Sequence, residues 1–360
     1  MKKKTILFMA AMSFFGIVLQ AQETNEAQKA VAEAAAAIAN APEKAVKAPK
    51  PVYWTNSLMT NLNFIQSMYS NWAKGGYNNY TMSAYVDGNA KYKKNDLYWN
   101  NRLQLDYGFL FSQDKPILQK NKDRILLEST AGFKATNTLN YTAKFTFLSQ
   151  FSKGYTYPTP SAPADPANIT VQEWKDARIL KSGAFAPAVI NLGLGIDWIP
   201  NNWLTVNVAP LTGGFTIVGE ESLRKNYGMA RKKEHPLDTE PDVKDPKGNL
   251  MNGHVYKSAR FEFGAQVTAE AKLRINDNFE ASTYLLLFSN YLDKPQNIRV
   301  NWDNRFMWKV ARFFSINLTT NLIYDDKVLV VSEKYPDGRQ AIQFYEALQF
   351  GFTYTFASKK

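Results

Sequence analysis

Charged side chains recur at every second position in several stretches of the sequence, a spacing that could select or conduct ions. Within residues 298–310, one parity carries Arg299, Asn301, Asp303, Arg305 and Lys309. The opposite parity is aromatic or aliphatic except at one asparagine. Side chains two residues apart share a face of a β-strand, so this pattern places a polar face opposite an apolar one.

The same alternation in other stretches adds charged residues that we expect to line a water-filled interior. The candidates are Arg102, Asp106, Arg124, Glu128, Arg260, Glu262, Glu270, Lys272, Arg299, Asp303, Arg305 and Lys309. Cations without partners among them would favour anions in a pore. Charges paired with one another would instead fill a barrel that conducts nothing, and both interpretations stay open from the sequence.

Residues suited to catalysis or metal binding are sparse. The two histidines, His235 and His254, fall in one polar stretch, and the spacing from His254 to Ser258 is not that of a catalytic triad. Asp325 and Asp326 could touch a divalent cation, although adjacent acids in a polar loop are usually solvated. We therefore expect no enzyme, and no catalytic, cofactor or metal site.

The polar and apolar parities predict about twelve strands. Their ranges are 58–67, 80–92, 97–111, 124–135, 140–151, 185–199, 203–209, 259–275, 279–291, 298–310, 314–324 and 345–356. The last one presents Leu348, Phe350, Phe352, Tyr354 and Phe356 on one face and small polar residues on the other. Such a strand is typical of the closing strand of a transmembrane β-barrel, which should pair with the first strand.

The connections between these strands alternate in length. Every second one is short, at 93–96, 136–139, 200–202, 276–278 and 311–313. The others are long, at 152–184, 210–258 and 325–340, or moderate, at 70–79, 112–123 and 292–297. Trp99, Trp198, Trp203 and Trp308 all lie near the short connections, as expected of rings at a lipid headgroup layer. The pattern predicts a closed antiparallel transmembrane β-barrel with short periplasmic turns and long extracellular loops.

The N-terminus predicts export. Lysines at positions 2–4, an apolar stretch over 6–19 and Ala21 form the pattern of a cleaved signal peptide over 1–21. We expect an Ala- and Pro-rich periplasmic arm or linker over 22–52, the barrel over 53–356 and a tail over 357–360. The predicted location is the cell outer membrane.

Composition narrows the partners. The sequence contains no cysteine, which excludes a disulfide scaffold, and its formal net charge is +11. An exported protein rarely meets nucleic acid, so we expect none, and the phosphates of surface lipid or acidic solutes are the favoured counter-charges. A basic cluster could contact lipopolysaccharide or could simply be solvated; it comprises Arg224, Lys225, Arg231, Lys232 and Lys233.

Several segments resemble a family of uncharacterised Bacteroidota outer-membrane proteins, known only as a domain of unknown function. They are NWAKGG (71–76), YWNNRLQLDYGF (98–109), KNKDRILLESTAGFK (120–134), FLSQFSKGYTY (147–157), APLTGGFTI (209–217), LFSNY (287–291), NWDNRFMWKV (301–310) and IYDD (323–326). The resemblance spans about 53–356. It implies an outer-membrane location and carries no functional residue over.

Three hypotheses for function follow. The polar interior favours a narrow channel or small-solute transporter. The arm and the long 210–258 loop favour a non-conducting structural or accessory subunit with outer-membrane protein partners. A soluble exported β-protein is the third hypothesis.

Overall fold

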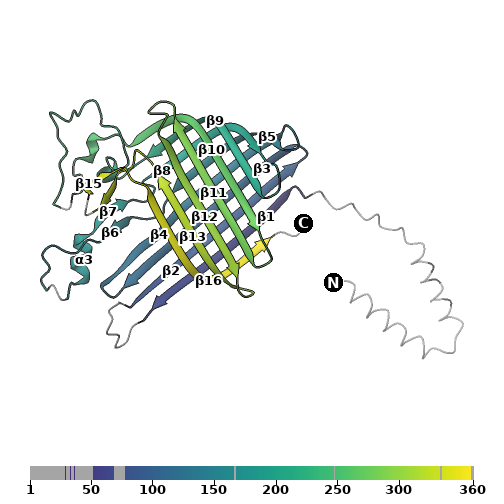
Figure 1. Cartoon of the computed structure of the whole chain (residues 1–360), viewed down its shortest axis with the longest axis horizontal. Helices are drawn as coiled ribbons and strands as arrows, with labels where there is room; N and C mark the ends of the chain where they lie inside the picture. The colour runs from purple at the N-terminus through teal and green to yellow at the C-terminus, as the bar shows by residue number, and fades with distance from the viewer. Residues whose placement is uncertain are drawn as a thin grey trace. The chain divides into compact units, whose positions relative to one another are not determined.

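A closed β-barrel dominates the part of the chain that the computed structural model describes, namely residues 29, 33, 36, 52–68, 78–165, 168–246, 248–332 and 335–357. Its twelve strands are all antiparallel to their neighbours, which confirms the predicted fold (Figure 1). Round the barrel the order is β1-β16-β13-β12-β11-β10-β9-β8-β5-β4-β3-β2. The predicted signal peptide and residues 358–360 lie outside the described residues.

The barrel strands cover most of the chain from Trp54 onward. Their bounds are β1 Trp54–Ser67, β2 Asn79–Lys94, β3 Leu97–Ser112, β4 Lys115–Lys134, β5 Leu139–Ser149, β8 Ala188–Trp198, β9 Leu204–Ile217, β10 Ala259–Arg274, β11 Phe279–Asn290, β12 Ile298–Lys309, β13 Phe314–Tyr324 and β16 Gln343–Ala357. Of the predicted 22–52 arm, only Lys29, Glu33, Ala36 and Val52 are described, the first three in helical conformation.

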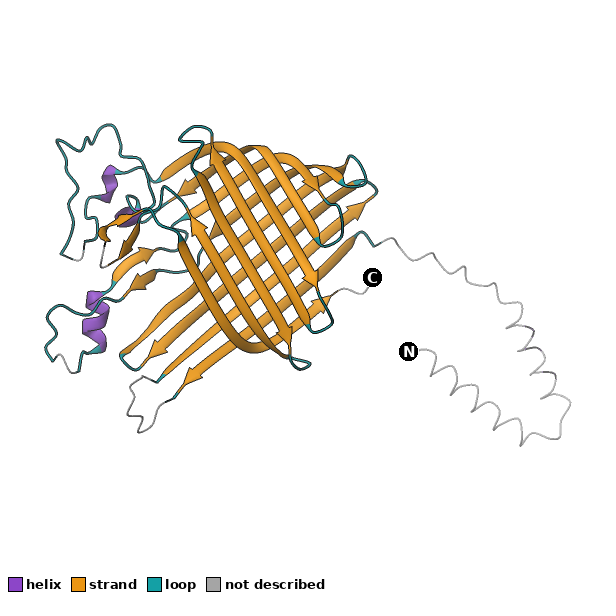
Figure 2. Ribbon diagram, in the orientation of Figure 1, coloured by secondary structure: helices purple, strands orange, loops and turns teal. Residues whose placement is uncertain are grey.

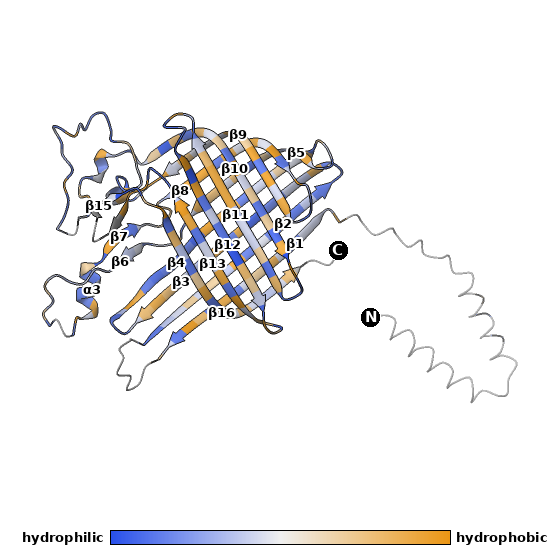
Figure 3. Ribbon diagram, in the orientation of Figure 1, coloured by the Kyte–Doolittle hydropathy of each residue, from blue (hydrophilic) through white to orange (hydrophobic). Residues whose placement is uncertain are grey.

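The closing strand realises the alternation that its sequence predicts. On β16, Phe350 and Phe352 are 42% and 66% exposed, whereas Gln349 before them and Thr353 after them are 4% and 9% exposed. Hydrophobic and hydrophilic residues likewise alternate along the strands in Figure 3. The predicted pairing of this strand with the first one is confirmed, since Phe356 lies opposite Leu58 on β1.

The two ends of the barrel differ in the length of their connections (Figure 2). At one end, the short-turn rim, residues 95–96, 135–138, 199–203, 275–278 and 310–313 join successive strands. At the other end, the loop rim, longer connections carry further elements. These are β6 Gly154–Thr156, α3 Val171–Ala177, β7 Ile179–Ser182, the short 3-10 helices η1 Glu221–Leu223 and η2 Gly253–Val255, β14 Val330–Ser332 and β15 Tyr335–Arg339.

The predicted connection at 112–123 is wrong, because β4 begins at Lys115 and only two residues separate it from β3. Register pairs such as Gln119 with Leu110 continue the ladder beyond the apolar part of the strands. A hydrogen-bonded hairpin in water requires no apolar face. The charged residues at the start of β4 therefore lack the alternation of polar and apolar residues that predicts a strand. Lys115 also donates to the carbonyl of Tyr157 at 3.1 Å and lies over the Trp174 ring of α3.

The seventh predicted strand ends too early, since β9 continues through Pro210 to Ile217. The register shifts here against both neighbours, between Leu194 and Ile196 on β8 and between Gly264 and Gln266 on β10. A bulge of this kind lets proline occupy a central strand although it donates no backbone hydrogen bond. The backbones approach closely at this bulge, where a Cβ on Gly195 would overlap the carbonyl of Val208.

Tryptophans gather near the short-turn rim. Trp99, Trp198, Trp203 and Trp308 are 45%, 46%, 43% and 53% exposed. Trp54 joins them, with its ring centroid 5.9 Å from that of Trp99. Among the described residues, no helix is long and apolar enough to cross a bilayer.

Residues 218–258, called the cap below, have a small apolar core of their own at the loop rim. Val218, Leu223 and Val255 are at most 1% exposed and pack with Met229, among other residues of the cap and of the preceding loop. The cap is tied to the barrel by Arg260 of β10, which donates to the carbonyls of Tyr227 and Gly228 at 2.9 and 3.0 Å.

Candidate functional site

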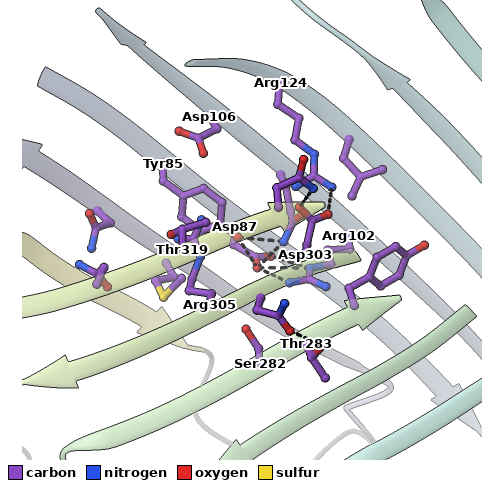
Figure 4. A pocket seen from close by; sticks show the side chains of 18 of the residues that line it. Tyr85, Asp87, Arg102, Asp106, Arg124, Ser282, Thr283, Asp303, Arg305 and Thr319 are labelled. Atoms are coloured by element: carbon purple, nitrogen blue, oxygen red, sulfur yellow. Dashed lines mark hydrogen bonds and ion pairs between the residues drawn. The ribbon is translucent and has the colours of Figure 1, made fainter. Parts of the chain in front are cut away.

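A cavity of about 890 Å³ lies inside the barrel (Figure 4). Its lining includes Ser57 and Thr355 near the short-turn rim and Gln150 and Pro187 near the loop rim. Nine of the twelve residues proposed from sequence lie in this lining, namely Arg102, Asp106, Arg124, Glu128, Glu270, Lys272, Asp303, Arg305 and Lys309. Strand alternation brings them together because each has the inward parity on its strand.

The structure places the other three, Arg260, Glu262 and Arg299, in a separate cluster beneath the cap. Arg299 forms ion pairs with Glu262 at 2.6 Å and with Asp325 at 2.9 Å. Arg260 contacts Glu262 at 3.5 Å as well as the two cap carbonyls. These charges therefore connect β10 and β12 to the loops rather than line the cavity.

Arg102 bridges opposite walls of the barrel. Its guanidinium contacts Asp87 of neighbouring β2 at 2.7 Å and Glu270 of β10, also at 2.7 Å. Four strands separate β3 from β10 one way round the barrel and six the other way. The interior is therefore narrow enough at this level for one side chain to reach across it.

Further bridges cross the cavity from β4. Arg124 pairs with Asp303 of β12 at 3.0 Å, with five strands between them in either direction. Glu128 accepts a hydrogen bond from Tyr284 of β11 at 3.0 Å. Lys122 donates to Gln349 of β16 at 3.1 Å. These contacts divide the lumen with polar side chains instead of leaving an open bore.

The charges of the lining balance, with seven carboxylates and seven cations. All seven carboxylates have ion-pair partners, namely Asp87, Asp106, Asp123, Glu128, Glu270, Glu280 and Asp303. Six of the cations are also paired. Arg305 is the exception, because it forms no ion pair within the described part of the chain and stacks on Tyr85 instead.

Several residues of this network lie outside the set predicted from the sequence. Tyr85 and Asp87 have the inward parity of β2, a signal that the alternation already contained. Lys122 was missed because its segment looked like a loop. Lys144 pairs with Glu128 at 3.0 Å, and nothing in the sequence indicates that partner.

The histidines and the acid pair in the loops are engaged with other side chains. His235 Nδ1 lies 2.6 Å from Glu240, and His254 Nε2 lies 3.6 Å from the same carboxylate. Asp325 pairs with Arg299, and Asp326 accepts from Asn297 at 2.8 Å. No group of three or more His, Cys, Asp or Glu side chains in the described ranges is arranged to hold a metal ion.

Three of the five residues of the predicted basic cluster serve the inside of the cap. Arg224 donates to backbone carbonyls, including that of Val218, at 3.3 Å. Lys225 and Arg231 both pair with Asp242, at 2.8 and 2.6 Å. Lys233 is exposed and Lys232 is half-buried.

Asp242 joins these two cations and a phenol. Tyr256 donates to its carboxylate at 2.9 Å. Burial alone would raise the pKa of Asp242, but hydrogen bonds from Lys225, Tyr256 and Arg231 lower that pKa below its ordinary value. Asp242 is therefore the charged centre around which one half of the cap is organised.

Part of the chain matches the model of a known protein family. Residues 64–155 match a protein family of unknown function, DUF3078. This agrees with the resemblance noted from the sequence, while an origin in the Bacteroidota stays a prediction. A search of the curated proteins finds no match.

Solved structures similar to the chain are barrels. An outer membrane channel from Pseudomonas putida F1 has 9% identity and a TM-score of 0.35, covering 88% of this chain and 100% of that one. The translocator domain of the autotransporter NalP from Neisseria meningitidis has 9% identity and a TM-score of 0.34, covering 92% and 98%. The NanC porin has 8% identity and a TM-score of 0.32, covering 84% and 99%. These values transfer no activity, and the barrel assignment rests on the strand pairing above.

Proposed function

We propose that the protein is an outer-membrane β-barrel that acts as a narrow channel for small polar solutes, and that it is not an enzyme. The observation that carries this proposal is the polar cavity, whose lining extends from Thr355 near one rim to Gln150 near the other. A charged, water-compatible interior is required for passage of solutes and has no equivalent in the packed core of a soluble sandwich.

The exterior supports the membrane location. Exposed aromatic and aliphatic side chains such as Leu62, Phe215 and Phe352 cover the strands, being 63%, 48% and 66% exposed. Such a surface would aggregate in water but is the outward band of a transmembrane barrel. The short-turn rim then faces the periplasm and the cap faces outward. In this proposal lipid surrounds the barrel, and the exposed Lys233 of the cap is a candidate contact for lipopolysaccharide phosphates.

The cross-lumen bridges predict a low conductance. Arg102 with Glu270, and Arg124 with Asp303, each join strands on opposite sides of the interior. A solute must pass between these side chains or separate them, so only small solutes are expected to enter. The bridges also predict that their removal widens the path.

Planar-bilayer recordings of the purified protein test the proposal. We expect small, discrete conductance steps for the wild type and larger steps for the double variant Arg102→Gln/Glu270→Gln, which removes the ion pair and shortens the side chain at 102 while keeping a polar group at both positions. The matched control Arg312→Gln removes a cation in the exposed turn at the short-turn rim, outside the cavity lining, and should conduct as the wild type does. An absence of steps in both the wild type and the double variant would refute the channel.

The second candidate function is a non-conducting subunit of an outer-membrane assembly. The specific observation in its favour is that side-chain bridges cross the lumen while the cap has a folded core of its own. A barrel with an obstructed lumen and a folded surface element could bind partner proteins without conducting solutes. Native electrophoresis of gently solubilised outer membranes tests it, because a species of single-chain size would count against an assembly.

A further inference from the structure

Arg305 on the wall of the cavity contacts an aromatic ring in place of a carboxylate. Its guanidinium carbon lies 3.5 Å from the ring centroid of Tyr85, which is a close stacking contact. Stacking uses the face of the guanidinium and leaves its N–H donors at the edge. No carboxylate of the described residues pairs with those donors.

Tyr85 holds this guanidinium on a fixed platform. The ring is 5% exposed, its hydroxyl donates to Asp87 at 3.1 Å, and the same oxygen accepts from Gln104 at 2.8 Å. Burial and the two hydrogen bonds at the hydroxyl hold the Tyr85 ring in place, so Arg305 stacks on it in a defined orientation without an anion. Little ordering of this pair is then required when a ligand arrives.

Two hydroxyls flank Arg305 on the neighbouring strands. Ser282 of β11 and Thr319 of β13 are its direct register partners, and all three side chains line the cavity (Figure 4). Directly opposed residues on paired strands have Cβ atoms about 5 Å apart, so the three side chains leave the wall in one row across neighbouring strands. Neither hydroxyl has a hydrogen-bond partner among the described residues.

The carboxylates near Arg305 already have partners of their own. Asp303 pairs with Arg124 at 3.0 Å and accepts a hydrogen bond from Asn321 at 2.6 Å, and Asp106 lies 3.8 Å from Lys122. Asp87, which accepts from the Tyr85 hydroxyl, pairs with Arg102 at 2.7 Å. Each carboxylate is therefore engaged by another group, whereas Arg305 has no carboxylate partner among the described residues.

We propose that Ser282, Arg305 and Thr319 form a binding site for a small oxyanion, carrying a carboxylate or phosphate group, inside the barrel. The planar guanidinium binds two oxygens of the anion at once, and the hydroxyls donate from either side. This inference rests on the proposed function in that it names the solute class of the channel, but binding itself requires no conduction.

Calorimetric titration of the purified protein in detergent tests the site, with inorganic phosphate and acetate as separate probes. We expect the wild type to bind at least one of them, and the tighter probe identifies the oxyanion class. Arg305→Gln should weaken that binding by about tenfold or more, since it removes a charge-assisted pair of hydrogen bonds. The matched control Arg312→Gln, in an exposed short turn, removes the same charge and should bind as the wild type does.

A second variant distinguishes a loss of binding from a loss of folding. Arg305→Lys keeps the charge but loses the planar fork, and should bind more weakly than the wild type. Wild-type binding that is absent for both probes, undiminished in either Arg305 variant, or equally reduced in Arg312→Gln would overturn the site. Binding without conductance would instead refute the channel and leave the oxyanion site standing.

Discussion

At the scale of single residues, the interior is organised by pairs that join distant strands. Arg102 serves two carboxylates at once, and Asp87 beneath it is only 6% exposed. Removing one partner of such a pair destabilises the fold by more than the pair itself stabilises it, because the remaining charge is left poorly solvated. Arg102 should therefore contribute to the stability of the barrel as well as to its bore.

We expect Arg102→Gln to lower the free energy of unfolding by about 2 kcal/mol, the value of charge-assisted hydrogen bonds lost in a partly wet interior. Denaturant titration followed by the electrophoretic mobility of the unboiled barrel measures this change. Arg274→Gln provides the comparison, since its pair is exposed and should contribute about 0–1 kcal/mol. Equal losses in the two variants would contradict the assigned role of the cross-lumen pair.

At the scale of elements, the barrel and the cap are stabilised in different ways. The strands are held by a continuous ladder that closes at the pairing of β1 with β16. The cap contains only two 3-10 helices of three residues each among its described residues, and depends on side chains that bind loop carbonyls. A loosened cap should therefore leave the ladder of the barrel intact.

Asp242→Asn should loosen the cap selectively. The substitution removes the negative charge that Lys225 and Arg231 share. We expect cleavage of residues 218–258 by an added protease to become roughly tenfold faster, equivalent to the loss of one charge-assisted hydrogen bond, while the barrel core stays protected. Faster cleavage of the barrel as well would show that the cap is not an independent unit.

The same carboxylate gives the cap a dependence on pH. Because the folded-state pKa of Asp242 is lowered, its stabilising contribution is fully present above the ordinary carboxyl pKa, about 3.9, and is lost as pH falls through the folded value. The protection factors of the cap amides, which are exchange rates corrected for the intrinsic rate at each pH, should therefore fall at acid pH. The fall should be smaller in Asp242→Asn, and an equal fall in both proteins would argue against this carboxylate.

At the scale of the whole molecule, the exterior and interior must face different solvents. Phe350 lies on the outside of β16, whereas Thr355 on the same strand lines the cavity. Phe350→Lys should cost about 2–4 kcal/mol of folding into lipid bilayers if the position lies near the bilayer midplane. Thr355→Lys, the matched control, should fold with wild-type yield in vesicle refolding assays. Equal yields of the two variants would contradict the membrane-spanning assignment.

Much of this arrangement could be predicted from short-range patterns. Strand parity placed Arg305 and Asp303 inward and Phe350 outward because the side-chain period of a strand is two. The pattern failed where a strand left the bilayer, as at Lys115 to Asp123, since a hairpin in water requires no apolar face. It failed again at Pro210, where a bulge continued a strand that proline normally ends.

The sequence by itself determined the class of fold, the number of barrel strands, which face of each strand is polar, and which end carries the short turns. These properties depend on residues close together in the chain. Only the tertiary structure decided that Arg102 reaches Glu270, that Arg124 reaches Asp303, and that Arg305 is left with an aromatic ring. The reason is geometric, because closure of the barrel sets which walls face each other, and residues on those walls are far apart in sequence.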